Sequence, residues 1–544
     1  MKSFFCILAA LLLIVPACLA EYLDLDLPVQ YPLDEKGEAM VNDVDFSRYT
    51  PVDDNNRVFY EIFVGSFSDS DGDGVGDLRG IINRMDYLND GDPQSGVSLG
   101  VEGIWLTPIF SSPSYHKYDI ADFYSVDPQF GSLNDLKELI ALCHERDVKL
   151  ILDLPINHTS TENRWFKNFV SAHTMNNPDN IWYDFYTWLP AGSKAPAGRR
   201  FISVSRAKLL YEANFSDSIP ELNYDNESVR KTMLDVAKFY LDMGIDGFRF
   251  DAAKYIYFGD NPQSAQFWDW YMGELRQIKP DVYTVAEVWD GDGVIDQYIP
   301  YTNCFNFPAS QTSGLIAETA KAGNVNRFTA YVQQYQEKIL SLRTDAANVF
   351  FIANHDTDRA AGYLTVASGQ AKIAANLYLL SPGSPFIYYG EEIGMRGSRG
   401  GANTDANRRL AMLWGDGDTV KDPVGTTYDT AKQTPYSVKD LKKMSDSLYN
   451  YYKRLIMIRK ANPEIARGTY AALSFPDTKA GGFIAAWEGN IVAVIHNTTG
   501  RTITLDLAAA GAPYGMLSAV IGVGGASLNG AVLTLDGQTS AVLR

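Results

Sequence analysis

Four stretches decide the fold: Leu152-Asp153-Leu-Pro-Ile-Asn157-His158, Gly247-Phe-Arg249-Phe-Asp251-Ala-Ala-Lys254, Val285-Ala-Glu287-Val-Trp289 and Phe351-Ile-Ala-Asn354-His355-Asp356. Each is a short apolar run that closes on Asp, Glu, His or Arg. A buried strand that ends in an acid is costly, because an ionised carboxylate loses its hydration. One such acid can be a structural ion pair, but four indicate a site where strand ends converge. The (β/α)₈ barrel gathers the ends of its parallel strands at one catalytic face.

The rest of the chain supports this architecture. Short apolar runs alternate with amphipathic helical stretches from about residue 57, which is typical of βαβ units. We expect eight strands, at 57–67, 103–110, 149–157, 247–253, 283–289, 304–307, 348–356 and 384–391.

Domain boundaries are predicted where this alternation of strand-like and helix-like stretches changes. Residues 51–157 and 221–465 are predicted to form an α/β domain, a (β/α)₈ TIM barrel. Residues 158–220, rich in Asn, Trp, Tyr, Pro and Gly, are predicted to be a subdomain inserted after the third strand. Period-2 alternation predicts an antiparallel β-sandwich at 466–544. Residues 21–50 are polar and predict an N-terminal arm.

The N-terminus has the features of an export signal. Lys2 precedes a 12-residue apolar stretch, and cleavage after Ala20 would make residues 1–20 a signal peptide. A second interpretation is a lipobox, Val15-Pro-Ala-Cys18, which would place a lipid anchor on Cys18. We therefore expect a secreted or periplasmic protein, or a lipoprotein at the cell surface. The cysteines beyond this segment, Cys143 and Cys304, are predicted to be buried thiols.

The amino-acid composition limits the classes of molecule that the protein is expected to bind. A net charge of −19 and a pI of about 4.8 disfavour nucleic acid, which requires basic patches. Aromatic residues make up 12% of the chain, and they serve either as core or as flat platforms for sugar rings. No other stretch has the length and apolar character of a membrane span. We expect a monomer that acts on a neutral substrate.

The acids suit the cleavage of a glycosidic bond. That reaction uses two carboxyl groups, one ionised nucleophile and one protonated acid, around an oxocarbenium-like transition state. Asp251 fits the nucleophile, because Arg249 lies two residues earlier on the same strand face and is expected to keep it ionised. Glu287 has apolar neighbours that would raise its pKa. Asp356 and His355 can grip ring hydroxyls and stabilise positive charge.

In their order along the chain, the four stretches resemble the sequence regions of the α-amylase family of glycoside hydrolases. The resemblance covers about residues 50–465. Further stretches agree with it: Gly103-Ile-Trp-Leu-Thr-Pro108, Tyr115-His-Lys-Tyr118-Asp119, Ile219-Pro-Glu-Leu-Asn223 and Gly383-Ser-Pro-Phe-Ile-Tyr-Tyr-Gly390-Glu391.

The resemblance implies a role for each matching residue. Asp251 would be the nucleophile, Glu287 the acid/base and Asp356 the stabiliser of the transition state. The family is retaining, so the carboxyl groups of Asp251 and Glu287 should lie about 5–5.5 Å apart. Arg249 would orient the nucleophile. The other positions implied in substrate binding are Tyr118 as the stacking platform, His158 and His355 as hydrogen-bond partners of sugar hydroxyls, and Asp153 and Lys254.

One departure from the family's pattern concerns the fourth strand. The family's α-amylases usually have Lys-His after this strand, and this chain has Lys254-Tyr255. That position contacts sugars on the leaving-group side, and its carbonyl often joins a calcium held at the position of Asn157. A second calcium at Asn157 is therefore left open.

A separate metal site is predicted after the first strand, in Asp69-Ser-Asp71-Gly-Asp73-Gly-Val75-Gly-Asp77. Carboxylates at alternate positions with glycines between them let a short loop wrap hard oxygens around Ca²⁺. We expect the four acids and the carbonyl of Val75 as ligands. The loop resembles the start of an EF-hand but has Gly80 at the twelfth position. The alternative is an acidic solvent loop without a metal.

The sequence thus predicts a retaining enzyme that cleaves internal α-1,4 bonds of starch or maltodextrins. Within the same class, the alternatives are an oligosaccharide α-glucosidase, an α-1,6-glucosidase or a transglycosylase. From another class, the alternative is a non-catalytic barrel that only binds glucan, which the intact Asp251, Glu287 and Asp356 disfavour.

Overall fold

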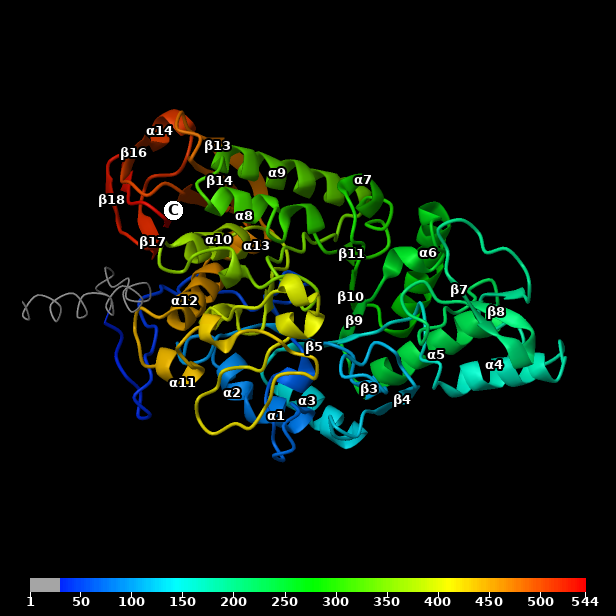
Figure 1. Cartoon of the computed structure of the whole chain (residues 1–544). Helices are drawn as coiled ribbons and strands as arrows, with labels where there is room; N and C mark the ends of the chain where they lie inside the picture. The colour runs from blue at the N-terminus through cyan, green and yellow to red at the C-terminus, as the bar shows by residue number, and fades with distance from the viewer. Residues whose placement is uncertain (1–29) are drawn as a thin grey trace, which may run out of the picture.

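The structure is a computed structural model that describes residues 30–544 (Figure 1). The predicted signal peptide, Cys18 and the first residues of the predicted arm lie outside the described residues. Among residues 30–544, no helix combines the length and the apolar character that crossing a membrane requires.

A parallel sheet forms the centre of the molecule. Its strand order is β11-β10-β9-β5-β2-β1-β12, so the strands follow one another around the sheet and the last returns beside the first. This curled sheet confirms the predicted α/β barrel class. Its strands are β1 (Phe59–Ile62), β2 (Gly103–Leu106), β5 (Lys149–Asp153), β9 (Gly247–Phe250), β10 (Tyr283–Ala286), β11 (Asn303–Cys304) and β12 (Phe386–Tyr388).

The prediction of eight strands was wrong for residues 348–356. This segment lies between β11 and β12 and makes one bridge, Phe305 with Val349. It accepts hydrogen bonds from both sides, from Asn306 N to Val349 O (2.9 Å) and from Phe386 N to Phe350 O (2.8 Å). The segment therefore closes the barrel, but its paired run is too short to be a strand.

Aromatic side chains fill the barrel interior. Phe59 of β1 stacks on Phe386 of β12 with ring centroids 4.6 Å apart. Gly103 makes room for this packing, because a Cβ there would lie 2.4 Å from the ring of Phe59. The interior cluster also holds Trp105, Ile151, Tyr283, Val285, Phe305, Phe307, Val349 and Phe351. A packed interior leaves the strand ends as the place for a site.

Helices surround the sheet and begin at side-chain caps. Ser132 and Asp135 form a capping box at α3, and Asn226 caps α5, which ends at Gly244 in the left-handed region. The helices are α1 (Leu78–Asn83), α2 (Met85–Leu88), α3 (Leu133–Glu145), α4 (Arg164–Thr174), α5 (Glu227–Met243), α6 (Asn261–Ile278), α7 (Asp292–Ile295), α8 (Leu315–Ala320), α9 (Val325–Leu342), α10 (Gln370–Leu379), α11 (Val438–Leu441), α12 (Leu448–Ala461), α13 (Pro463–Arg467) and α14 (Leu507–Ala510).

Two small antiparallel sheets interrupt the barrel. One pairs β3 (Phe110–Ser111) with β4 (Asp122–Val126). The other has the order β6-β8-β7, with β6 (Trp188–Pro190), β7 (Phe201–Val204) and β8 (Leu209–Glu212). The second sheet and α4 project from the side of the barrel that is remote from the C-terminal sheets in Figure 1.

The C-terminal residues form two antiparallel sheets. A five-stranded sheet has the order β13-β14-β15-β20-β17 and a three-stranded sheet the order β16-β19-β18. Apolar residues of both sheets, such as Ile495 and Leu533, share one core. The strands are β13 (Thr469–Ser474), β14 (Ala480–Trp487), β15 (Asn490–Asn497), β16 (Ile503–Asp506), β17 (Leu517–Gly522), β18 (Ala526–Asn529), β19 (Val532–Leu535) and β20 (Thr539–Leu543).

Candidate active site

The three predicted catalytic acids lie in the wall of one cavity. Asp251 follows the last residue of β9, Glu287 follows the last residue of β10, and Asp356 is the last residue of the segment that closes the barrel. The cavity has a volume of about 630 Å³, within the usual range of ligand pockets, about 300–1,000 Å³. Each acid is mostly buried but keeps part of its surface open to the cavity.

The turn after β9 couples Asp251 to Glu287. Ala252 has φ = 50°, a left-handed conformation that costs a residue with a Cβ about 1 kcal/mol or more. Its N–H donates a hydrogen bond of 2.9 Å to Oε2 of Glu287. The strained turn therefore holds one carboxyl group in place relative to the other.

Arg249 forms the charged floor beneath these acids. Its Nη1 lies 2.7 Å from Asp251 Oδ1 and 2.9 Å from Asp153 Oδ1, and its Nη2 lies 3.0 Å from Glu287 Oε2. Both Arg249 and Asp153 are inaccessible to solvent. One guanidinium thus orients three carboxylates, which a planar fork can do and a lysine cannot.

The environment separates the proton affinities of the acids. Burial raises the pKa of Glu287 to about 7 against the opposing charge of Arg249, as a general acid needs. Burial also raises the pKa of Asp251, although Arg249 opposes it. Arg249 contacts Asp251 as expected, and its charge favours the ionised carboxylate; that Asp251 is ionised in the free enzyme stays a prediction.

His355 and Asp356 form a charged pair. Although burial lowers the pKa of His355, the carboxylates of Asp356 and Glu61 raise it to about 10. Its Nδ1 lies 2.5 Å from Glu61 Oε1 and its Nε2 lies 2.9 Å from Asp356 Oδ2. Burial raises the pKa of Asp356, but His355 and Arg409 outweigh it and hold that pKa well below its usual range. Asp356 is therefore an ionised carboxylate at neutral pH.

Tyr118 and His158 also line the cavity. The ring of Tyr118 stacks on His355 with centroids 5.5 Å apart, and its hydroxyl donates to Asp153 Oδ2 at 2.7 Å. Burial lowers the pKa of His158 to about 4, so this imidazole is neutral. Its buried Nε2 has no hydrogen-bond partner in the described residues. A polar atom left unpaired at a cavity wall suits contact with a ligand hydroxyl.

The remaining residues predicted to bind substrate do not line the cavity. Asp153, Arg249 and His355 lie beneath its floor, where they orient the acids and Tyr118. Lys254 points to Asp290 Oδ2 (3.0 Å) and to the carbonyl of Trp289 (2.8 Å). Arg249 has the position expected of a residue that orients the nucleophile, because it contacts Asp251. Contact of Asp153, His355 and Lys254 with substrate stays a prediction.

Several cavity residues were not predicted. Arg409 pairs with Asp356 at 2.7 Å, and Trp289, which is 41% exposed, stacks on Phe307. Phe215, which is 44% exposed, packs edge-on against Tyr255. The other unpredicted lining residues are Tyr115, His116, Ile219, Asn403, Thr404 and Asp405. Some of these residues lie within the stretches that carry the family resemblance, namely Tyr115, His116, Ile219 and Trp289. The others come from loops without a recognisable motif.

The acidic loop after β1 brings three of its four acids together. Carboxylate oxygens of Asp69, Asp71 and Asp77 lie within 4.8 Å of one another. Two oxygens that bind one Ca²⁺ at 2.3–2.6 Å are at most about 5 Å apart, so this set fits the ion. Asp73 lies outside the group, and its Oδ1 accepts from Val75 N at 2.7 Å. The roles of Asp73 and of the Val75 carbonyl as ligands stay predictions.

Comparisons with known proteins agree with this geometry. Residues 61–468 match the family model described as "Alpha amylase, catalytic domain". Alpha-amylase 3 of Dictyoglomus thermophilum is 35% identical over 456 residues, covering 81% of this chain and 84% of that protein. A 4-alpha-glucanotransferase of Thermotoga neapolitana is 30% identical over 459 residues, covering 82% and 97%. The solved structure of Eubacterium rectale Amy13B has a TM-score of 0.81 at 31% identity, covering 91% and 97%.

Proposed function

Because the chain belongs to the α-amylase family of glycoside hydrolases, we propose that it hydrolyses internal α-1,4-glucosidic bonds of starch and maltodextrins with retention of configuration. One observation carries the proposal: Arg249 contacts both Asp251 and Glu287, and Glu287 has a pKa of about 7. A carboxyl group with a pKa of about 7 can keep its proton at neutral pH, as a general acid requires, while Arg249 favours the ionised form of its neighbour Asp251.

The proposed reaction has two steps. Asp251 attacks the anomeric carbon while Glu287 donates its proton to the departing glucosidic oxygen, which leaves a covalent glycosyl-enzyme ester. Glu287, now ionised, then takes a proton from water, and the resulting nucleophile releases the sugar from Asp251. The same residue serves as acid and then as base.

Asp356 is proposed to stabilise the positive charge that develops on the sugar ring. It is ionised, and His355 and Arg409 hold both of its oxygens in fixed positions. A carboxylate that is already oriented needs no reorganisation in the transition state. Tyr118 would support the sugar ring from the cavity wall. Because His158 Nδ1 accepts from Asn157 Nδ2, the neutral imidazole carries its proton on Nε2, which would donate to a sugar hydroxyl.

A transglycosylase is the second candidate, because the relative from Thermotoga neapolitana is a 4-alpha-glucanotransferase. Both reactions share the covalent intermediate and differ in whether water or a sugar hydroxyl attacks it. Product analysis on starch, pullulan, isomaltose and maltotriose tests the proposal. Release of short maltodextrins from starch supports hydrolysis of α-1,4 bonds. Longer products from maltotriose indicate transfer, and cleavage of isomaltose indicates α-1,6 specificity.

We also propose that the triad Asp69, Asp71 and Asp77 binds a structural Ca²⁺. Support comes from the spacing of the carboxylates, and burial of Asp69 and Asp77 would make their repulsion costly without a cation. Asp77 is also the N-cap of α1, so the ion would connect β1 to this helix.

Export is proposed from residues 1–20. Mass spectrometry of the mature N-terminus distinguishes cleavage before Glu21 from a lipid-modified Cys18. An N-terminus that starts at Met1 in the mature protein argues against both.

A further inference from the structure

Glu61 is a buried acid to which the proposed reaction gives no role. It lies on β1, whose four residues are all buried. Side chains alternate along a strand, so Glu61 shares the face of Phe59, which packs in the barrel interior. Its partners on the neighbouring strands are Trp105 of β2 and Tyr388 of β12. Glu61 therefore lies inside the barrel, two residues closer than Phe59 to the strand ends that carry the site.

Both ring nitrogens of His355 face a carboxylate. Nδ1 lies 2.5 Å from Glu61 Oε1, and the same oxygen accepts from the backbone N–H of His355 at 3.3 Å. Nε2 lies 2.9 Å from Asp356 Oδ2. A neutral imidazole has a lone pair on one nitrogen, which would face a negative oxygen at one of these two contacts. The imidazolium donates at both contacts, so the geometry favours a charged ring.

Tyr118 gives a second indication of a proton on Nε2 of His355. The hydroxyl of Tyr118 donates to Asp153 Oδ2 at 2.7 Å and lies 2.8 Å from Nε2. Since a hydroxyl has one proton, which is directed to Asp153, the oxygen accepts at the second contact and Nε2 donates. Burial lowers the pKa of His355, but Asp356 and Glu61 outweigh burial and raise this pKa to about 10.

Two cations also lie close to the imidazole of His355. Arg409 Nη2 is 2.7 Å from Asp356 Oδ1, and its Nε donates to the carbonyl of His355 at 3.0 Å. Arg249 Nη1 lies 3.5 Å from the hydroxyl of Tyr118, whose ring stacks on the imidazole. Like charges disfavour an imidazolium, so the ring depends on its acidic neighbours to keep its second proton.

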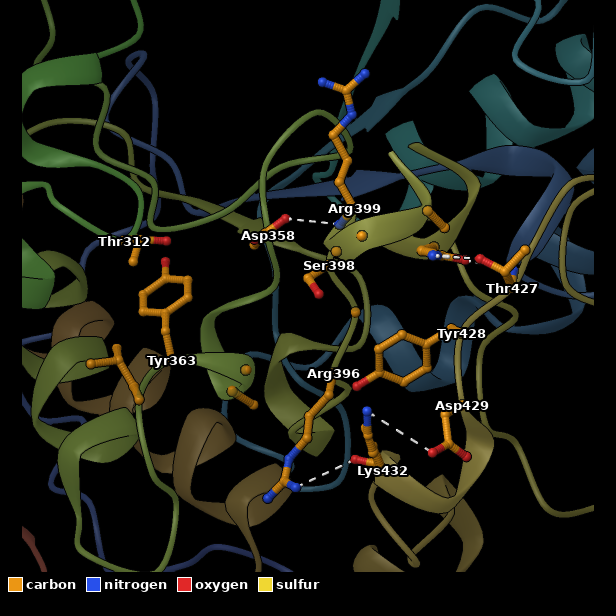
Figure 2. A pocket seen from close by; sticks show the side chains of 18 of the residues that line it. Thr312, Asp358, Tyr363, Arg396, Ser398, Arg399, Thr427, Tyr428, Asp429 and Lys432 are labelled. Carbon is orange, nitrogen blue, oxygen red and sulfur yellow. Dashed lines mark hydrogen bonds and ion pairs between the residues drawn. The ribbon is translucent and has the colours of Figure 1, made fainter. Parts of the chain in front are cut away.

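Among the acids of residues 30–544, Glu61 and Asp356 are the two that contact the ring. Asp358, the next acid along the chain, has partners of its own. Figure 2 shows its hydrogen bond with the backbone N–H of Arg399, at 3.2 Å, and it also accepts from Arg408 Nε at 2.8 Å. Because the proposed role of Asp356 directs it toward the sugar, Glu61 is the acid left to fix the charge of the ring.

We propose that Glu61 is a positioning residue that keeps His355 an imidazolium, so that the Nε2–H group holds Asp356 in the orientation that stabilises the transition state. This inference rests on the proposed function and deepens it, because it adds a residue of β1 to the groups that control the reaction. Without the charge of Glu61, His355 would become neutral at alkaline pH. A lone pair on Nε2 would then repel Asp356 and break their contact.

NMR titration of the histidines tests the charge of His355. The chain has six histidines, and the signal that His355→Gln removes is that of His355. After labelling of histidine with 15N, both ring nitrogens of His355 in the wild type should keep the shifts of an imidazolium from pH 6 to pH 9. Glu61→Gln keeps the shape of the side chain without its charge and should lower the pKa of His355 by about 1–3 units. Glu61→Asp, which keeps the charge, should restore part of that shift.

Glu102→Gln is the matched control for loss of a buried carboxylate. Glu102 is 5% exposed and accepts from Val58 N at 3.0 Å, just before the first residues of β1 and β2. It lies at the opposite ends of these strands from the site. Its replacement should leave the pKa of His355 unchanged.

Kinetics on α-maltosyl fluoride tests the consequence for the reaction. Fluoride leaves without a proton, so kcat/KM for this substrate does not require the acid form of Glu287. The wild type and Glu102→Gln should keep a nearly constant kcat/KM from pH 6 to pH 9. Glu61→Gln should lose about tenfold or more over this range, because an electrostatic contact in the transition state is lost. The midpoint of the loss should equal the pKa of His355 that NMR measures in the same variant.

The possible outcomes separate this inference from the proposed function. A pKa of His355 that is the same in Glu61→Gln as in Glu102→Gln overturns the inference, and so does a neutral His355 in the wild type at pH 7. A loss of kcat/KM in Glu61→Gln that is equal at pH 6 and pH 9 also overturns it, because a purely structural role has that result. If the wild type does not cleave α-maltosyl fluoride, the proposed function fails, and the NMR titration alone decides whether Glu61 sets the charge of His355. Thermal melting confirms that each variant is folded.

Discussion

Replacement of Arg249 by methionine would remove the one cation that three buried carboxylates share. Methionine approximates the length of the arginine stem but leaves Asp153, Asp251 and Glu287 without their common partner. Removal of one partner from a buried ion pair typically costs about 3–5 kcal/mol, because the remaining charge is desolvated and uncompensated. The loss should therefore exceed that of any surface ion pair in this protein.

The expected change in melting temperature follows from the size of the barrel. With an unfolding entropy of ~2.1 cal/mol/K per residue over about 400 residues of matched barrel, a loss of 3–5 kcal/mol lowers Tm by roughly 4–6 °C. Arg501→Met is the matched control, because Arg501 pairs with Asp477 at 2.8 Å but is 73% exposed. Exposed pairs contribute about 0–1 kcal/mol, so its Tm should change by at most about 1 °C.

The decrease in Tm caused by Arg249→Met should also depend on pH. Loss of Arg249 raises the pKa values of the three carboxyl groups in the folded state. In the unfolded chain these pKa values keep their ordinary level, so the folded state holds more protons than the unfolded state. A folded state that holds more protons than the unfolded state loses stability as pH rises. The Tm difference between wild type and Arg249→Met should therefore be smallest near pH 5 and larger at pH 8.

Differential scanning calorimetry at pH 5 and pH 8 measures both effects, and circular dichroism confirms the fold. A Tm for Arg249→Met within about 1 °C of the wild type at both pH values would refute the shared-cation interpretation. A deficit that is the same at pH 5 and pH 8 would show that lost packing, and not uncompensated charge, causes it.

The remaining predictions concern the acids and the metal. Asp251→Asn should lower kcat at least about a thousandfold without loss of glucan binding, and activity within tenfold of wild type would exclude Asp251 as nucleophile. Glu287→Gln should lose far more activity on starch than on an aryl glycoside with a good leaving group, and equal losses would contradict its role as acid. The kcat/KM of the wild type should fall above about pH 7, since only protonated Glu287 donates, and a profile flat to pH 9 would contradict its raised pKa. Chelation should lower the Tm of the wild type and of Asp73→Ala but not that of Asp71→Ala; equal sensitivity in both variants would place the important ion elsewhere.

Barrel class was predictable because each strand carried its own signal. The runs at β5, β9 and β10 are mostly apolar, and each ends in or is followed by an acid, which is typical of parallel strands with a site at their carboxyl ends. The segment 348–356 carries the same signal. Its short pairing depends on contacts with Asn306 and Phe386, which are distant in the sequence.

The strand β1 also carries an acid in a buried apolar run, but this acid was not predicted to be part of the site. Glu61 lies within the apolar run Phe59–Ile62 and contacts His355, so a search for acids in buried strands identifies it as part of the site. Arg409 and Phe215 carry no such signal. They reach the cavity on long loops, whose paths are set by tertiary contacts and not by local pattern.

Which charged side chains contact one another could be predicted only in part from the sequence. Spacing of two residues on one strand predicted the contact of Arg249 with Asp251. It did not predict that Asp153 and Glu287 contact the same guanidinium, because these residues lie on other strands. The composition of the loop after β1 likewise predicted a cluster of acids but not which three meet.

Covalent trapping tests the central claim most directly. Incubation with 5-fluoro-α-glucosyl fluoride keeps formation of the glycosyl-enzyme fast through its good leaving group and slows its hydrolysis, since fluorine destabilises the oxocarbenium-like transition state. Peptide mass spectrometry should then find one added fluoroglucosyl group, on the carboxyl group of Asp251. A label on Glu287 or Asp356 would contradict the assignment of roles, and turnover that proceeds with no label and with inverted products would contradict the retaining mechanism itself.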